Sequence, residues 1–129
     1  MKPLAIAAAL AAATAFWPMA ASADSASETV TAATHAGLAA KAGNIEGVHT
    51  HLHHALNCLV GPGGTGFDKT NINPCGNAGK GAIPDATDAA TKKALEAAAD
   101  KARAGIAATD FETAKNDATS VEEMLKATK

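Results

Sequence analysis

The residues of this chain best suited to chemistry are its five histidines, all of which lie between positions 35 and 54. Four of them fall in the run His49-Thr50-His51-Leu52-His53-His54, and Cys58 follows one helical turn later. Neutral imidazole is the commonest metal ligand in proteins and suits copper, zinc and nickel. A helix that only faces solvent would carry charged or other polar residues in such a run. The sequence therefore predicts binding of a metal or a haem, with catalysis a secondary hypothesis.

The first 23 residues have the pattern of a secretory signal peptide. Lys2 supplies the positive start, an apolar stretch follows from Leu4 to Trp17, and Ala21-Ser22-Ala23 offers a small-x-small cleavage site. A membrane anchor is disfavoured because this apolar stretch is too short for a full span. We therefore expect export to the periplasm, no membrane association after cleavage, and one domain over residues 24–129.

Helix start and stop signals divide that domain into four helical segments. The expected helices cover residues 27–42, 45–60, 86–108 and 109–127. Ser25–Glu28 and Thr109–Glu112 have the spacing of capping boxes, and Asp85 is the expected N-cap of the third segment. A glycine-rich stretch beginning at Gly61 ends the second segment.

The helical segments predict an all-α fold, an antiparallel four-helix bundle made of two hairpins. The hairpins cover residues 27–60 and 86–127, and a long loop over 61–85 joins them. Apolar side chains recur at spacings of three and four in the second hairpin, as packed helices require. These side chains are Leu95, Ala99, Ala102, Ile106, Phe111, Ala114, Ala118, Val121 and Leu125. A weak repeat aligns the two hairpin turns, and the second hairpin has no histidines, which favours a functional role for those of the first.

Both cysteines, Cys58 and Cys75, lie in the part expected to be exported. In an oxidising compartment a pair of cysteines is normally joined, so we predict a disulfide in preference to a pair of thiolate ligands. Closing a loop of about 16 residues contributes about 3 kcal/mol to stability. The disulfide removes Cys58 from the candidate ligands and folds the loop over one face of the second helix.

Composition and motifs exclude several function classes. The formal net charge is −2, and neither a basic stripe nor a set of stacking aromatics indicates nucleic-acid binding. The glycine-rich stretches do not match a phosphate-binding loop. No nucleophile motif is present, so we do not expect an enzyme. The sequence leaves open whether the protein is a monomer or a dimer.

The spacing of the histidines indicates which of them share a site. His49 and His53 are four residues apart at the edge of the apolar face of the second helix, the spacing of two histidines that bind one metal. The turn at residues 43–44 sets residues whose numbers sum to about 87 opposite each other, which brings His35 level with positions 51–53. We therefore predict a primary cluster of His35, His49 and His53, with Glu46 or Asn57 completing or orienting it.

His51 and His54 point to the other face of the same helix and are predicted to form a second, more exposed site. With the cysteines oxidised, the expected ligands are nitrogen atoms, with carboxylate as a further candidate. Such a set suits Cu(II), Ni(II) or Zn(II), and the intrinsic affinity order favours copper.

In these features the chain resembles the small periplasmic metal-binding proteins of the nitrifying-bacterium type. The resemblance rests on the signal peptide, the two hairpins, and His35, His49 and His53 on helices. It implies an exported, Ala-rich four-helix bundle that binds copper, nickel and other divalent ions. That family spreads histidines through all its helices, whereas here they are confined to one hairpin, and the Cys58–Cys75 loop is additional. One or two metal sites per chain are therefore expected.

The leading hypothesis is a periplasmic protein that sequesters or delivers a divalent transition metal. A b-type haem protein is the first alternative, with His35 and His53 as axial ligands between facing helices. Covalent haem attachment is excluded because no Cys-x-x-Cys-His motif is present. The second alternative is a non-metal interaction module of the cell envelope, with the loop as docking surface and the histidines as a pH-responsive patch.

Overall fold

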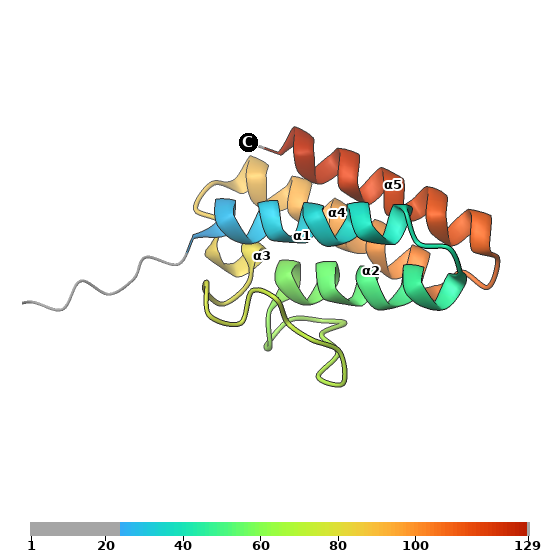
Figure 1. The fold of residues 1–129 in the computed structure, drawn as a ribbon. Coiled ribbons are helices and arrows are strands. Elements are labelled where there is room, and N and C mark those ends of the chain that lie inside the picture. The colour runs from blue at the N-terminus through green and yellow to red at the C-terminus, as the bar shows by residue number, and fades with distance from the viewer. Residues whose placement is uncertain (1–23, 129) are drawn as a thin grey trace, which may run out of the picture.

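The computed structural model describes residues 24–128, and this part of the chain contains five helices and no strand (Figure 1). The helices are α1 (Ser25–Ala40), α2 (Ile45–Val60), α3 (Ala82–Asp85), α4 (Ala89–Ala107) and α5 (Phe111–Ala127). The all-α prediction is therefore confirmed for the described residues. The predicted signal peptide lies outside them. Within residues 24–128, no helix combines the length and apolar character needed to cross a membrane.

The four long helices pack side by side around one core (Figure 1). Helix α1 packs against α2 and α5, and α4 packs against the same two helices. Most of the apolar side chains predicted to form seams on α4 and α5 are buried, Leu95 and Val121 fully, whereas Ile106 and Phe111 are only partly buried. Alanine makes up much of the core, so the helix backbones can approach closely and little side-chain entropy is lost on packing.

Helix α1 begins two residues earlier than predicted, and its cap differs. The side chain of Asp24 accepts hydrogen bonds from the backbone N–H groups of Ala26 and Ser27, at 3.1 and 3.2 Å. The predicted capping box is wrong because both of its side chains are used elsewhere. The hydroxyl of Ser25 donates to the carbonyl of Ala82, and Glu28 is buried.

Helix α2 has the predicted bounds, Ile45–Val60. The side chain of Asn44 accepts a hydrogen bond from the Gly47 N–H at 2.8 Å and caps its start. Gly61 ends the helix with a φ of 65°. A side chain is excluded there because a Cβ on Gly61 would lie 1.6 Å from the carbonyl oxygen of Lys80.

The stretch predicted as a loop contains the short helix α3, and α4 begins later than expected. Asp85 is not the N-cap of α4, because it ends α3 and its carboxylate accepts a hydrogen bond from the Lys80 N–H at 2.6 Å. Asp88 caps α4 instead, accepting from the Thr91 N–H at 2.8 Å. The second predicted capping box is shifted by one residue, since Asp110 is the N-cap of α5.

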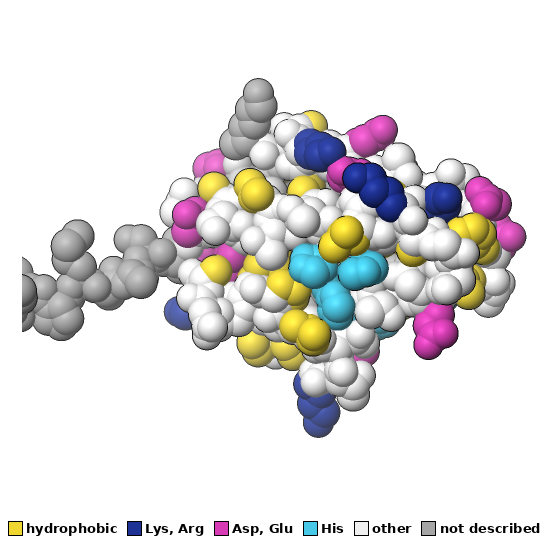
Figure 2. Space-filling view, viewed as in Figure 1, with side chains coloured by type: hydrophobic (Ala, Val, Ile, Leu, Met, Phe, Trp, Pro, Cys, Tyr) yellow, Lys and Arg dark blue, Asp and Glu magenta, His cyan; other side chains and the backbone are white. Residues whose placement is uncertain are grey.

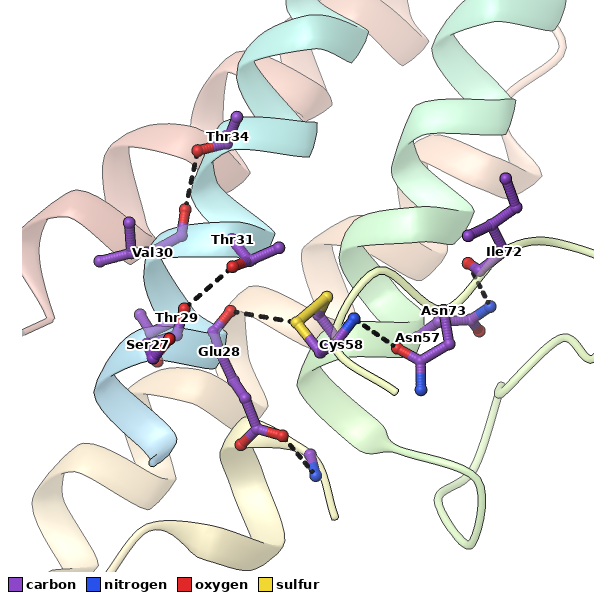
Figure 3. Close-up of a disulfide and its surroundings, with 12 residues drawn as sticks. Ser27, Glu28, Thr29, Val30, Thr31, Thr34, Asn57, Cys58, Ile72 and Asn73 are labelled. Carbon is purple, nitrogen blue, oxygen red and sulfur yellow. Dashed lines mark hydrogen bonds between the residues drawn. A yellow bond between two sulfur atoms is a disulfide. The ribbon is translucent and has the colours of Figure 1, made fainter. Parts of the chain in front are cut away.

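The predicted disulfide between Cys58 and Cys75 is present, with the two Cα atoms 5.1 Å apart. It joins the last turn of α2 to the loop, and both residues are buried. Figure 3 shows the bond next to Glu28 of α1. The Sγ atom of Cys75 lies 3.8 Å from the carbonyl oxygen of Glu28, so the loop also contacts α1.

Asn57 fastens the same loop to α2 through its amide side chain. Its Oδ1 accepts from the Asp68 N–H at 2.9 Å, and its Nδ2 donates to the carbonyls of Asp68, Asn71 and Ile72 at 2.9 to 3.3 Å. Asn57 is fully buried. The loop therefore keeps its place by polar contacts as well as by the disulfide.

We expect Asn57→Ala to lower the free energy of unfolding by about 2 kcal/mol, because several hydrogen bonds of about 0.5–1.5 kcal/mol each are lost together. Urea unfolding monitored by circular dichroism measures the change. Asn77→Ala is the matched control: Asn77 is exposed in the same loop, and its replacement should change stability by less than about 0.5 kcal/mol. Equal effects of the two substitutions would contradict the role of Asn57 in fastening the loop to α2.

Candidate metal centre

The structure brings three histidines together where α1 faces α2. They are His35 of α1 and His51 and His54 of α2, and each offers one ring nitrogen so that all three nitrogens lie within 4.8 Å of one another. The ring centroids are 5.8 Å apart for His35 and His51, 5.1 Å for His35 and His54, and 5.5 Å for His51 and His54. We call these three residues the histidine triad. Figure 2 shows histidine side chains gathered in a patch on this face, with hydrophobic side chains beside them.

The local sequence explains this convergence. Helices α1 and α2 are joined by only four residues, 41–44, so the turn sets the register between them. The predicted register brings His35 level with positions 51–53, and His51 is one of its neighbours in the structure. His54 follows His51 by three residues, a spacing that keeps two side chains on one face of a helix.

The triad has unused hydrogen-bonding atoms. The Nδ1 atoms of His35, His51 and His54 are all buried and have no hydrogen-bond partner, as is also true of Nδ1 of His53 outside the triad. Leaving a buried polar atom unpaired costs about 1–3 kcal/mol, so three such atoms in one place need an explanation. A metal ion would accept these lone pairs, provided that the ligating nitrogens are the unpaired ones. Tetrahedral coordination at 2.0–2.1 Å requires nitrogens about 3.3 Å apart, which rotation of the rings could provide.

Burial also sets the protonation of the triad. His54 is 8% exposed, and His35 and His51 are half-buried. Burial lowers the pKa of His35 below its ordinary value of 6.5, and the neighbouring charges of His54 and His51 act in the same direction. Burial likewise lowers the pKa of His54, with smaller contributions from His51 and His53. Both rings are therefore neutral at neutral pH, the form that can bind a metal.

The structure does not group His49 and His53 with His35 as predicted, and each of the two contacts another part of the fold. The Nε2 atom of His49 lies 3.0 Å from the carbonyl oxygen of Ala108, which ends α4. The Nδ1 atom of His53 lies 3.6 Å from Oδ2 of Asp68 in the loop. The physical reason is that α2 has neighbours on three sides, α1, α4 and the loop, and its histidines are shared among them.

Asp68 is organised to stay ionised beside His53. Hydrogen bonds from Thr70, through its side chain first and then its backbone N–H, hold the pKa of Asp68 down to about 2, and Asn71 and His53 add to the effect. The negative charge therefore faces His53 over the ordinary pH range. This arrangement favours a loop contact for His53. In the haem alternative His53 would pair with His35 as an axial ligand, whereas the contact observed for its Nδ1 is with Asp68.

The other predicted site residues have structural positions. His51 and His54 belong to the same group as His35, and His54 is buried instead of exposed. Glu46 is exposed in the first turn of α2, and the candidate group found among residues 24–128 contains no carboxylate. Asn57 is engaged with the loop, so its amide is not free to orient a histidine. All three residues of the triad were therefore among the predicted ligands, but the structure combines them differently from the prediction.

Comparison of the chain with models of known protein families, with curated proteins and with solved structures gives no match. The chemical reading of the site therefore rests on its geometry. Three imidazoles without a thiolate could hold a divalent transition metal and leave at least one coordination position for another ligand.

Proposed function

We propose that this protein binds a divalent transition metal, copper, nickel or zinc, through His35, His51 and His54, and sequesters or delivers it. The observation that carries the proposal is the convergence of three imidazoles whose ligating nitrogens lie within 4.8 Å of one another. The three buried, unpaired Nδ1 atoms support it, because a metal would compensate for their missing hydrogen bonds. Catalysis is not part of the proposal.

The proposal includes the setting of the site. We propose that the chain is exported to the periplasm and that α1, α2, α4 and α5 form an antiparallel four-helix bundle of two hairpins. The packing of α1 and of α4 against both α2 and α5 supports this arrangement. The disulfide between Cys58 and Cys75 supports an oxidising compartment. A site with all-nitrogen ligands would also keep its donors in that compartment, because imidazole is not consumed by disulfide formation.

Metal titration of the purified protein tests the function directly. Isothermal calorimetry with Cu(II), Ni(II) and Zn(II), after removal of any metal carried through purification, should give at least one tight site per chain. Elemental analysis of the protein as isolated, with a visible spectrum, identifies the metal and would show a haem by its Soret band. If none of the three metals is taken up, the proposed function is wrong.

The pH dependence of metal binding is expected to begin below pH 6.5. Protons compete with the metal for the ring nitrogens, and affinity falls as pH drops through the pKa values of the metal-free site. Because the pKa values of His35 and His54 are lowered, protons compete with the metal for these two rings mainly below pH 6.5. Titrations at pH 7.5, 6.5 and 5.5 should give a smaller change over the first unit than over the second.

A further inference from the structure

Glu28 is a carboxyl group enclosed at the base of the loop, away from the histidine triad. Glu28 is fully buried. Its Oε1 accepts a hydrogen bond from the Gly81 N–H at 3.0 Å, whereas its Oε2 is buried and has no hydrogen-bond partner. Figure 3 shows the Glu28 side chain extending from α1 toward this hydrogen bond. A buried carboxyl with one unsatisfied oxygen is costly when it is ionised.

The carboxyl group of Glu28 lies where the two ends of the loop, Gly61 and Gly81, approach each other. A Cβ on Gly81 would lie 2.6 Å from the backbone nitrogen of Gly61, so the two glycines allow the chain to close here. The hydroxyl of Ser25 adds a second link from α1, donating to the carbonyl of Ala82 at 2.7 Å. Glu28 therefore connects the start of α1 to the closure of the loop.

The charged groups that act on Glu28 are both negative: Asp85 of α3 and Asp24 at the start of α1. The backbone N–H of Lys80 does not offset these negative charges at Glu28, because it donates its hydrogen bond to the carboxylate of Asp85. Among residues 24–128, no lysine or arginine forms an ion pair with Glu28. Burial raises the pKa of Glu28 from 4.5 to about 7, the hydrogen bond from Gly81 opposes this, and the charges of Asp85 and Asp24 add to it. The carboxyl is therefore close to half-protonated at neutral pH.

We propose that Glu28 is a proton-controlled latch that holds the base of the loop closed when its carboxyl is neutral. Oε2 has no partner as a carboxylate oxygen, but a neutral Glu28 carries an O–H that can donate to the nearby carboxylate of Asp85, which the ionised form cannot do. Loss of that proton leaves a buried negative charge facing a second carboxylate, and the junction between α1 and the loop weakens. The latch is independent of metal binding and goes beyond the proposed function.

The sign of the effect follows from the proton balance. The folded protein holds this proton up to a pH of about 7, whereas the carboxyl of the unfolded chain releases it near its ordinary value of 4.5. The contribution of Glu28 is thus fully present below pH 4.5 and is lost as pH rises to about 7. His35 and His54 act in the opposite direction: their stabilising contribution is present above pH 6.5 and lost at lower pH, because their pKa values are lowered.

Urea unfolding of the purified protein between pH 4.5 and 8.5 tests the latch. The ratio of the unfolding constants of the wild type and Glu28→Gln cancels the contribution of the histidines. We expect this ratio to rise with pH, by up to about tenfold per unit, and to level off above about pH 7, since one proton is involved. When both proteins also carry Asp85→Asn, the rise should level off at a lower pH, because Asp85 raises the pKa of Glu28 in the folded state. The control Glu46→Gln, at an exposed glutamate, should give a ratio independent of pH.

A ratio for Glu28→Gln that does not change with pH would overturn the latch. If that variant does not fold, carboxyl ¹³C chemical shifts of the wild type decide the matter: titration of Glu28 near 4.5 overturns the proposal, and titration near 7 supports it. Hydrogen exchange of the Gly81 amide supplies a local readout. After correction for the intrinsic pH dependence of exchange, it should lose protection as pH rises through 7 in the wild type.

Discussion

Replacing His51 and His54 by Ala should lower the affinity for the tightest-bound divalent metal by about a hundredfold or more. The two substitutions remove two of the three imidazoles that converge. Loss of a group that only orients a ligand already costs about 10- to 100-fold, so loss of two ligands should cost at least as much. Calorimetric titration with Cu(II), Ni(II) and Zn(II) measures the change.

The matched control is His49→Ala with His53→Ala, which removes two histidines of the same helix that lie outside the triad. His49 approaches the carbonyl of Ala108, and His53 approaches Asp68, so their loss should alter affinity by less than about threefold. Circular dichroism checks that both variants keep their helices. If the control variant loses binding and the His51, His54 variant keeps it, the sequence-based grouping is right and the triad is wrong.

Replacing Cys58 and Cys75 by Ala should lower the free energy of unfolding by about 3 kcal/mol. The disulfide closes a loop with a sequence separation of 17 residues, and its loss frees the unfolded chain from this restriction. The described core consists mostly of small side chains, so little other stabilisation is available to offset the loss. Urea unfolding of the variant and the wild type at pH 7 measures the difference.

Reduction of the wild type provides the control for this prediction. These two cysteines are the only ones in the chain, so a reducing agent should lower the stability of the wild type to that of the variant. It should leave the variant itself unchanged. A difference below about 1 kcal/mol between oxidised and reduced wild type would mean that the Asn57 contacts hold the loop without the covalent bond.

Local rules predicted the helices well because their signals are contained in short stretches of sequence. Helix α2 has the predicted bounds since Asn44 and Gly61 mark both ends. The starts of α1, α4 and α5 differ from the predicted ones by two or three residues, because several neighbouring side chains could serve as caps. Which of them does so depends on distant partners: Ser25 bonds Ala82, and Glu28 bonds Gly81.

The amino-acid pattern alone predicted that the candidate metal ligands lie between residues 35 and 54, that the cysteines pair, and that His35 is level with the second helix near position 51. Which histidines meet depends on how the helices and the loop pack together. The helical repeat gives the face of α2 on which each side chain lies, but it does not give the part of the fold that packs against each face. The rotation of α2 depends on packing against α1, α4 and the loop together, and that packing turns His51 and His54 toward His35 while His49 and His53 contact other parts of the fold.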